Sequence, residues 1–236
     1  MIPEADSGTV TDPANHREPQ RDHLGRAHQP NVERIGRDDV EWDKRYAEVE
    51  QVWSGEPNGA LVAEVGGLEP GTALNVGCGE GADAIWLAGR GWQVTAIDAS
   101  DIALQRAAVA AKQSHVEVEW IHAGLLDAIL PSSGFDLVSA QYPALLHTPD
   151  RKAERRLIDA VAPFGHLLVV HHADIDIEQA KTHGFDPADY VAPGDAALLL
   201  DERWQVTFDE RRLRQVHSGA GVGHSHDVVL HAHRLS

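Results

Sequence analysis

The sequence predicts an α/β protein built on a doubly wound, mostly parallel β-sheet. Apolar, strand-like runs alternate with helical patterns between residues 72 and 175, and this order builds parallel sheets with right-handed crossovers. A glycine-rich turn follows the first run, and two β-rich stretches, Arg203 to Val216 and His226 to His233, follow at the end. A chain of 236 residues is long enough to bury a full core in one domain.

Residues 1–36 are expected to lie outside this domain. They are rich in Pro, Asp, Asn, Gln, His and Arg and show almost no apolar periodicity. A segment with so few apolar side chains cannot offset the entropy cost of ordering. We therefore predict a disordered or loosely docked tail, followed by a single domain over residues 37–236.

The first part of that domain, residues 37–70, is expected to form a helical cap. Aromatic and apolar side chains recur at helical spacing in its first half, at Trp42, Tyr46, Val49 and Trp53. A break rich in Gly and Pro follows at residues 54–59, and a second helix is expected over 60–65. Gly66-Gly67 and Pro70-Gly71 end that helix.

The glycine turn is the most informative local feature. The strand at residues 72–76 runs into Gly77, Gly79 and Gly81, and a helix is expected over 80–90. Glycines at these positions let the backbone approach a ligand closely, because no Cβ is in the way. The following helix begins with unpaired N–H groups and a positive dipole end.

The second strand, residues 93–97, ends just before Asp98. An acidic residue about 20 positions after such glycines, at the carboxyl end of a strand, is placed to bind a ribose diol. Ser100 is a candidate N-cap for the next helix, with Asp101 in its first turn. The sequence therefore indicates a ligand that contains adenosine.

Three more strands are expected at residues 116–121, 135–140 and 166–171, with a helix before the last. That helix places Leu157, Ile158 and Val161 on one face. Ligands of such sheets bind beyond the carboxyl ends of the strands. The glycine turn, Asp98 and the segments after the third and fourth strands should therefore surround one cleft.

Two cofactors fit these residues. The pattern Gly77-x-Gly79-x-x-Ala82 matches the nicotinamide-dinucleotide fingerprint, whereas Gly77-x-Gly79-x-Gly81 resembles the first motif of the class I S-adenosylmethionine-dependent methyltransferases. The stretch Gly134 to Gln141, which contains Phe-Asp-Leu-Val, resembles the fourth strand of that family. About seventy residues precede the glycine strand, whereas a dinucleotide domain commonly opens with it. These features favour the methyltransferase.

The resemblance implies a seven-stranded, Rossmann-like sheet closed by an antiparallel C-terminal hairpin. It implies S-adenosylmethionine as cofactor and S-adenosylhomocysteine as product. Asp98 would bind the ribose, the backbone after the third strand would meet the adenine, and the glycine turn would hold the methionine part. The expected cofactor-binding residues are Arg45, Tyr46, Trp53, Asn75, Gly77, Cys78, Gly79, Gly81, Asp98, Ala99, Gly124, Leu125, Leu126 and Gln141.

Two positions depart from the family pattern. Asn75 stands where the family usually has a carboxylate that orients the ammonium end of the cofactor. Gly124 stands where an Asp often accepts a hydrogen bond from the adenine amine, and Asp127 is a candidate to replace it. These departures keep a non-catalytic S-adenosylmethionine-binding protein as one alternative.

The cap resembles that of the tellurite-resistance and thiopurine methyltransferases, which act on small molecules. The similar residues are Trp42-Asp43-x-Arg45-Tyr46 and Trp53-Ser54-Gly55-x-Pro57-Asn58. By this resemblance Arg45 would pair with the methionine carboxylate, and Tyr46 or Trp53 would form a wall near the sulfonium. The open alternative is that these aromatic residues only form a stripe packed on the sheet.

No catalytic base stands out in the sequence. Candidates near the strand ends are Tyr142, His147 and one of His171 and His172. Gln141-Tyr142-Pro143-Ala144 replaces the Asn/Asp-Pro-Pro-Tyr motif of amine-methylating enzymes, which disfavours adenine or glutamine nitrogen as acceptor. The histidine pairs near the end of the chain lack an evident third ligand, so we expect no metal.

The net charge of −17 excludes a surface suited to a nucleic-acid backbone. No apolar run is long enough to span a membrane, and the N-terminus lacks the pattern of a signal peptide. The single cysteine, Cys78, is typical of a reducing cytoplasm. We therefore predict a cytoplasmic enzyme that methylates a small molecule; an NAD(P)-dependent oxidoreductase remains an alternative, and the oligomeric state is not predicted.

Overall fold

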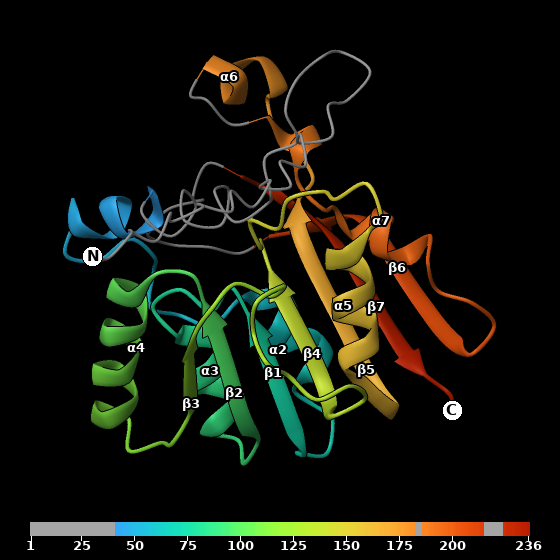
Figure 1. Ribbon diagram of the computed structural model, residues 1–236, viewed down its shortest axis with the longest axis horizontal. Coiled ribbons are helices and arrows are strands. Elements are labelled where there is room, and N and C mark those ends of the chain that lie inside the picture. Colours follow the sequence, from blue (N-terminus) through green and yellow to red (C-terminus); the bar gives the residue numbers. More distant parts are fainter. Residues whose placement is uncertain (1–40, 183–185, 215–223) are drawn as a thin grey trace, which may run out of the picture.

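The computed structural model describes residues 41–182, 186–214 and 224–236, so the predicted tail lies outside the described residues. A seven-stranded sheet with the order β3-β2-β1-β4-β5-β7-β6 forms its centre. Figure 1 shows the strands side by side across the molecule, with helices in front of and behind the sheet. The strands are β1 (Thr72–Val76), β2 (Gln93–Asp98), β3 (Glu119–His122), β4 (Phe135–Gln141), β5 (Val161–His172), β6 (Trp204–Leu213) and β7 (His226–Arg234).

The first five strands are parallel to one another, and β7 runs antiparallel to both of its neighbours, β5 and β6. β1 lies between β2 and β4, at the point where the strand order reverses. The carboxyl ends of β1, β2 and β4 therefore share one edge of the sheet, the upper edge in Figure 1, where ligands of doubly wound sheets bind. The predicted fold class, including the C-terminal hairpin, is confirmed.

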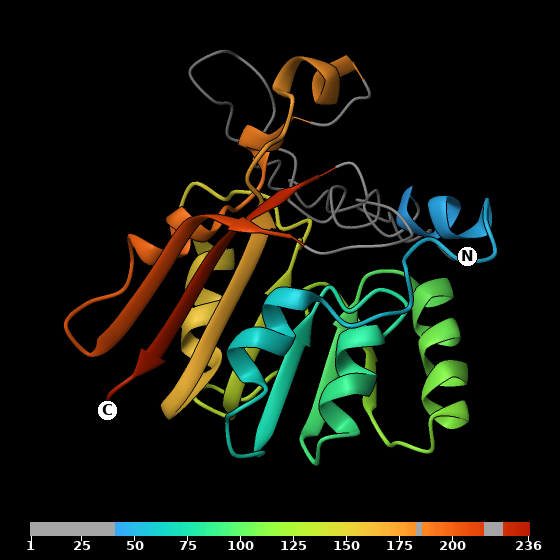
Figure 2. The same cartoon turned by 180° about the vertical axis from the view of Figure 1, so that it is seen from behind.

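Helices cover both faces of the sheet. α2 and α3 pack on one face, with α4 beside α3 (Figure 2), and α5 and α7 pack on the other. A short α6 and a 3₁₀ turn, η1, lie beyond β5. The bounds are α2 (Gly59–Val65), α3 (Ala82–Ala88), α4 (Asp101–Gln113), α5 (Lys152–Ala160), α6 (Ile177–Thr182), η1 (Pro187–Asp189) and α7 (Pro193–Ala197).

The cap begins with a helix over residues 41–47, drawn in blue in Figures 1 and 2. Trp42 and Tyr46 lie on it, but the chain leaves the helix before Val49 and Trp53. The prediction of one helical stripe through all four residues was therefore wrong at its end. The Arg106 guanidinium explains where the helix stops, because it binds the carbonyl oxygens of both Tyr46 and Val49 at 2.7 Å.

Two strands differ in length from the prediction. β3 begins three residues late because the N–H of Val116 bonds to the carbonyl of Ala111, closing the end of α4. β5 is longer than expected, since it begins at Val161, which pairs with Phe135. Val161 therefore belongs to the strand and not to the preceding helix. The predicted N-cap at Ser100 is confirmed, because its hydroxyl accepts from the N–H of Ala103.

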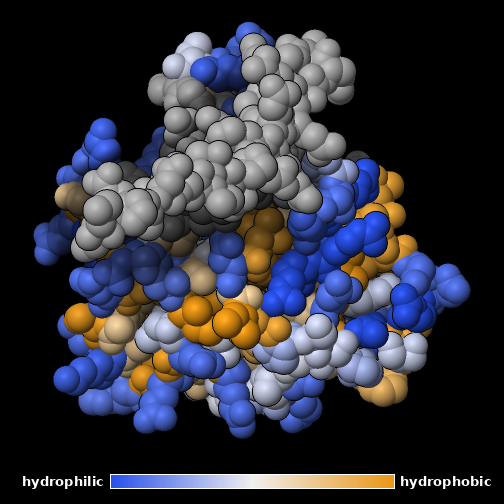
Figure 3. Space-filling view, viewed as in Figure 1, coloured by the Kyte–Doolittle hydropathy of each residue, from blue (hydrophilic) through white to orange (hydrophobic). Residues whose placement is uncertain are grey.

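Two layers of apolar side chains hold the sheet and the helices together. One layer lies between the sheet and α5 and α7, and the other lies under α2 and α3. On the face shown in Figure 3, polar residues surround hydrophobic patches of limited size. No helix among the described residues is long and apolar enough to cross a membrane.

Candidate functional site

The glycine turn after β1 has the backbone conformation that only glycine adopts without strain. Gly77, Gly79 and Gly81 have φ angles of 64°, 52° and 85°. The N–H of Cys78 donates to the carbonyl of Ile97, which ties the turn to β2. The N–H of Gly81 donates to the carbonyl of Cys78, which closes the turn before α3. The turn therefore presents backbone, not side chains, at the carboxyl edge of the sheet.

Side chains of neighbouring elements pack closely against the glycines of this turn. A Cβ on Gly81 would lie 2.7 Å from Cβ of Ala107 and 2.8 Å from the ring of Trp120, so α4 and β3 leave no space for one. A Cβ on Gly79 would lie 3.0 Å from both the Trp53 ring nitrogen and the Tyr46 hydroxyl. The cap and the sheet thus enclose the turn from two sides.

Asp98, at the end of β2, shapes the same turn. Its Oδ2 accepts from the N–H of Gly79 at 2.7 Å, and its Oδ1 accepts from Ser100 at 2.9 Å. Burial raises the pKa of this carboxyl above its usual value, while the two backbone donors act in the opposite direction. The carboxylate also lines the cavity described below, so it is placed both to hold the turn and to meet a ligand.

Two acidic residues after the turn tie the cap to the domain. Glu80 accepts from the backbone N–H groups of Val52 and Trp53 at 2.9–3.2 Å, and Asp83 accepts from the backbone and side-chain N–H groups of Asn58 at 2.7 and 2.8 Å. Burial raises the pKa of the Asp83 carboxyl, and Asn58 partly opposes the shift. These contacts hold residues 52–58 over the start of α3.

Arg106 and Asp43 complete this connection from α4. Arg106 binds Glu80 at 2.8 Å in addition to the carbonyls that end the cap helix. Asp43 accepts from the Ser100 hydroxyl at 2.6 Å. Sequence reasoning missed the roles of Glu80, Asp83 and Arg106, because each one joins segments more than 20 residues apart and no local pattern marks them.

Tyr46 and Trp53 both line the cavity and bind each other, with the indole N–H donating to the Tyr46 hydroxyl at 2.8 Å. The predicted aromatic wall is therefore present. Arg45, in contrast, is exposed and is absent from the cavity wall; its guanidinium lies 5.1 Å from the Trp42 ring centre and 5.7 Å from that of Trp53. The structure therefore does not bring Arg45 to the cavity wall, and its expected pairing with a bound carboxylate stays a prediction.

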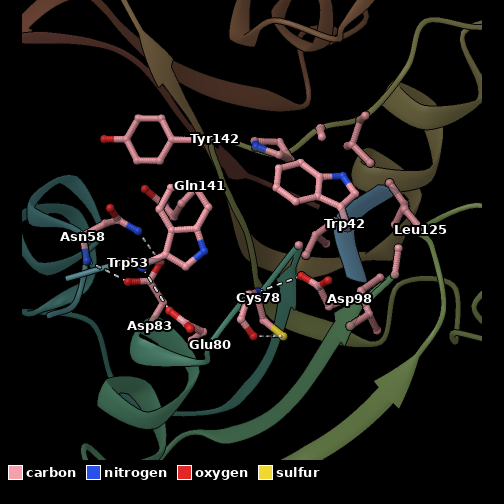
Figure 4. A pocket seen from close by; sticks show the side chains of 18 of the residues that line it. Trp42, Trp53, Asn58, Cys78, Glu80, Asp83, Asp98, Leu125, Gln141 and Tyr142 are labelled. Carbon is pink, nitrogen blue, oxygen red and sulfur yellow. Dashed lines mark hydrogen bonds between the residues drawn. The ribbon is translucent and has the colours of Figure 1, made fainter. Parts of the chain in front are cut away.

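One cavity of about 380 Å³ connects the glycine turn, the cap and the far end of β5. Pockets of drug-sized ligands begin at roughly 300 Å³. In Figure 4, Asp98 and Leu125 lie on one side of the cavity and Asn58 and Asp83 on the other, with Trp53 and Gln141 between them. The predicted residues that line it are Tyr46, Trp53, Gly77, Cys78, Gly79, Gly81, Asp98, Ala99, Gly124, Leu125, Leu126, Gln141, Tyr142 and His147.

Asn75 does not line the cavity. Its side chain is 1 % exposed, and its Oδ1 has no hydrogen-bond partner among the described residues. The structure therefore does not bring Asn75, one of the expected cofactor-binding residues, to the cavity wall. Gln141, on the neighbouring strand β4, has a similar unpaired oxygen. Its Nε2 donates to the Ser139 hydroxyl, but its buried Oε1 accepts from no described group. Gln141 itself lines the cavity, and this oxygen lies buried behind that wall.

The loop after β3 forms the side of the cavity that begins near Asp98. Leu125 and Leu126 line it, as does Asp127. A Cβ on Gly124 would lie 3.4 Å from Oδ2 of Asp127. The Asp127 carboxylate thus lies next to the place that a side chain at position 124 would occupy, which supports its candidacy as a replacement acceptor.

The predicted catalytic candidates differ in position. Tyr142 and His147 line the cavity, but His171 does not, and His172 lines it instead. Successive residues of a strand point to opposite faces, so only one histidine of this pair can face the cavity. Both ring nitrogens of His147 lie near carboxylates, Nδ1 at 3.5 Å from Glu154 and Nε2 at 3.6 Å from Asp195.

Cys78 is a packing residue of the turn. Burial raises the pKa of its thiol well above the usual value, and the Asp98 carboxylate acts in the same direction; a thiolate nucleophile is disfavoured. Among the residues that the structure describes, no three His, Cys, Asp or Glu side chains form a group that could hold a metal ion. The expectation of no metal stays a prediction.

Comparisons with known proteins agree with this geometry. Residues 73–165 match the family model of a methyltransferase domain. Over 98 residues the chain is 42 % identical to an uncharacterized methyltransferase of Mycobacterium bovis, covering 41 % of this chain and 48 % of the relative. The chain thus matches about half the length of this curated relative.

A second relative is the ubiquinone biosynthesis O-methyltransferase of Alkalilimnicola ehrlichii, 39 % identical over 108 residues, which are 44 % of this chain and 42 % of the relative. One similar solved structure carries the description "Conversion of a Disulfide Bond into a Thioacetal Group during Echinomycin Biosynthesis". Its TM-score is 0.64 at 24 % identity, covering 83 % of this chain and 92 % of that one; at this identity the likeness concerns the fold.

Proposed function

We propose that this protein is a class I S-adenosylmethionine-dependent methyltransferase that transfers the cofactor's methyl group to a small molecule. Its residues 73–165 match the model of a methyltransferase domain. The observation that carries the proposal is that one continuous cavity is lined both by the expected cofactor-binding residues and by polar residues from the other end of the sheet edge. One end of the cavity is walled by the glycine turn and Asp98, and the other by Tyr142 and His172, all under the same cap. One end can hold a nucleoside cofactor while the other holds an acceptor.

The residues present fit S-adenosylmethionine. The turn, free of Cβ atoms, can lie against the methionine part, and Asp98 can accept from the ribose hydroxyls. The unpaired Gln141 oxygen suits the cofactor's ammonium group. The rings of Tyr46 and Trp53 offer faces that favour a cation such as the sulfonium. When bound, the cofactor supplies the methyl group, and the chain's own residues align the acceptor and exclude water.

A small acceptor is supported by the cap and by charge. Residues 52–58 are held over the cavity by Glu80 and Asp83, which limits the size of what can enter. The net charge of −17 disfavours a nucleic-acid substrate. The similar O-methyltransferase of ubiquinone biosynthesis agrees with a small acceptor, and the cap resembles that of the tellurite-resistance and thiopurine group.

The departure from the family pattern at Asn75 does not support the alternative of a non-catalytic protein. Because Asn75 is buried away from the cavity, the exchange of a carboxylate for an amide leaves the cavity wall unchanged. The second candidate function therefore gains nothing from it.

The test is calorimetric titration of the protein with S-adenosylhomocysteine, with NAD in a parallel titration. We expect binding of S-adenosylhomocysteine alone. The Asp98→Ala variant should lose at least about tenfold in affinity, since hydrogen bonds to a charged group contribute about 1.5–3 kcal/mol. Asp150→Ala, at an exposed position outside the cavity, is the matched control. Binding of NAD alone would refute the proposal and favour the oxidoreductase.

A further inference from the structure

A polar cluster lies at the end of the cavity away from the glycine turn. Tyr142, His172 and Arg214 line the cavity, and Asp227 lies behind them, only 3 % exposed. They come from the ends of β4, β5 and β6 and the start of β7, so the closing hairpin supplies half of the group. The cofactor-binding part of the site does not use them.

The register of the sheet places His172 and Asp227 opposite each other on β5 and β7. Nδ1 of His172 lies 3.5 Å from Oδ1 of Asp227. Both atoms are buried, and neither has a hydrogen-bond partner among the described residues. The other oxygen of Asp227 accepts from the Tyr142 hydroxyl at 2.9 Å. A short movement would therefore close a hydrogen bond from the Nδ1–H of His172 to Asp227.

This contact selects the tautomer of the imidazole. A neutral histidine whose Nδ1–H points at a carboxylate carries its lone pair on Nε2. Because the Nδ1 edge of the ring is buried and the ring lines the cavity, the Nε2 edge is the one that a ligand can reach.

The ring is held in place by stacking on both sides. Its centre lies 4.3 Å from that of Tyr142 at an angle of 27°, and 3.9 Å from that of His224 at 11°. Tyr142 is held in turn, because its hydroxyl also accepts from Nε of Arg214 at 3.0 Å. A base fixed in this way loses little entropy when a substrate arrives.

The surroundings of the ring favour the neutral imidazole. Burial lowers the pKa of His172, His224 and Arg214 lower it further, and Asp227 partly opposes them. The titratable and charged groups that face the ring from the packed elements are Asp227 of β7, Tyr142 after β4, Arg214 after β6, and His224 before β7.

We propose that His172 is the general base of the methyl transfer, that Asp227 is its positioning residue, and that the acceptor is a hydroxyl group that is neutral at physiological pH. This inference rests on the proposed function. The acceptor oxygen bonds to the methyl carbon while the bond from that carbon to sulfur breaks and leaves its electron pair on sulfur. The hydroxyl proton moves to Nε2 of His172, so the products are a methyl ether, S-adenosylhomocysteine and an imidazolium.

The experiment compares acceptors that need a base with one that does not. The full-length protein and S-adenosylmethionine are assayed with catechol and 4-methoxyphenol, which are neutral at pH 7.5, and with 4-nitrothiophenol, which is ionised there. We expect His172→Gln to lower kcat/KM for the phenols by about 10²–10⁴-fold, the usual contribution of a general base. Transfer to the thiolate should change less than about threefold.

The control is His171→Gln, on the opposite face of the same strand and outside the cavity wall. It should keep wild-type kcat/KM for every acceptor. Equal losses for the phenols and the thiolate in His172→Gln would overturn the base assignment, and so would a wild-type enzyme that methylates the thiolate alone. Retained binding of S-adenosylhomocysteine in these variants separates this failure from failure of the proposed function.

The positioning role of Asp227 has its own readout. Nitrogen NMR of the ¹⁵N-histidine-labelled protein bound to S-adenosylhomocysteine should show His172 as the Nδ1–H tautomer, without any acceptor. In Asp227→Asn the tautomer of His172 should shift toward Nε2–H. The pH at which kcat/KM for the phenols falls on the acid side of the pH profile should shift as well. A wild-type Nε2–H tautomer, or an unchanged tautomer in the variant, would contradict the proposal.

Discussion

At the scale of single residues, the loop after β3 places one carboxylate, that of Asp127, beside a glycine at which the family pattern has another. Gly124 provides no acceptor for an adenine amine, but Oδ2 of Asp127 lies 3.4 Å from the position of a Cβ at that residue. Asp127 closes the turn that begins at Gly124, because its N–H bonds to the Gly124 carbonyl, and it lines the cavity. We infer that it takes the role that the family pattern gives to an Asp at position 124.

Asp127→Asn is therefore expected to weaken S-adenosylhomocysteine binding by about tenfold or more, because a hydrogen bond to a charged acceptor contributes about 1.5–3 kcal/mol. Calorimetry with S-inosylhomocysteine, which has no adenine amine, gives the decisive comparison. The variant and the wild type should bind that analogue with equal affinity. A tenfold loss for both ligands would mean that Asp127 acts on the loop and not on the amine.

At the scale of elements, the cap is attached mainly by polar contacts to α3 and α4. Arg106 joins α4 to Glu80 and to two carbonyls at the end of the cap helix. Asp43, on the cap helix, accepts hydrogen bonds from the Ser100 hydroxyl and the Ile102 N–H at the start of α4. The cap thus depends on buried or half-buried hydrogen bonds more than on a continuous apolar face, which makes it the part of the fold most easily released.

Arg106→Ala should detach the cap while the sheet stays folded. We expect faster amide hydrogen exchange over residues 41–58 and a loss of about tenfold in S-adenosylhomocysteine affinity, because Tyr46 and Trp53 no longer hold their places in the cavity wall. Exchange measured by mass spectrometry reports both regions in one experiment. Arg90→Ala, at an exposed arginine over the Trp86 ring, is the control and should leave residues 41–58 protected.

At the scale of the whole molecule, β5 carries two partly buried histidines, His171 and His172, at its carboxyl end. Burial lowers the pKa of His171 to about 4, and the neighbouring His172 acts in the same direction. In the unfolded chain a histidine has a pKa of about 6.5. Between these values the unfolded chain binds a proton that the folded protein does not, so stability falls as the pH falls through this window.

The unfolding free energy should therefore be highest above about pH 6.5 and decrease toward pH 4, by up to about 1.4 kcal/mol per pH unit for one such group. Acidification also neutralises part of the net charge of −17, which acts in the opposite direction. Urea unfolding of wild type and His171→Leu isolates the histidine, and the variant should show the shallower loss. His115→Asn, at an exposed position, is the control; identical slopes in wild type and His171→Leu would contradict this account.

The sequence predicted the sheet well because its signals are local. The glycines of the turn, the N-cap at Ser100 and the alternation of apolar runs each depend on a few neighbouring residues. β3 was placed less well because a hydrogen bond from Val116 to Ala111 extends the closing turn of α4. The end of the cap helix was missed because a tertiary contact, from Arg106 to the Tyr46 carbonyl, marks it.

The site was predicted best where topology alone fixes it. The turn, Asp98 and the loop after β3 converge because the strands end together. Arg45 could not be placed from its spacing, because a helix of residues 41–47 turns that side chain outward. The choice between His171 and His172 depended on which face of β5 meets the cavity, and the partner of His172 lies on β7, 55 positions later in the chain.

The attachment of the cap has a thermodynamic consequence. Since Tyr46 and Trp53 belong to the cap and also to the cavity wall, cap closure and cofactor binding are two equilibria that share the same contacts. Such coupling is reciprocal: the factor by which closure raises cofactor affinity is the factor by which the cofactor raises the closed population. Protection of residues 41–58 from a protease is therefore a measure of cofactor occupancy that requires no knowledge of the acceptor.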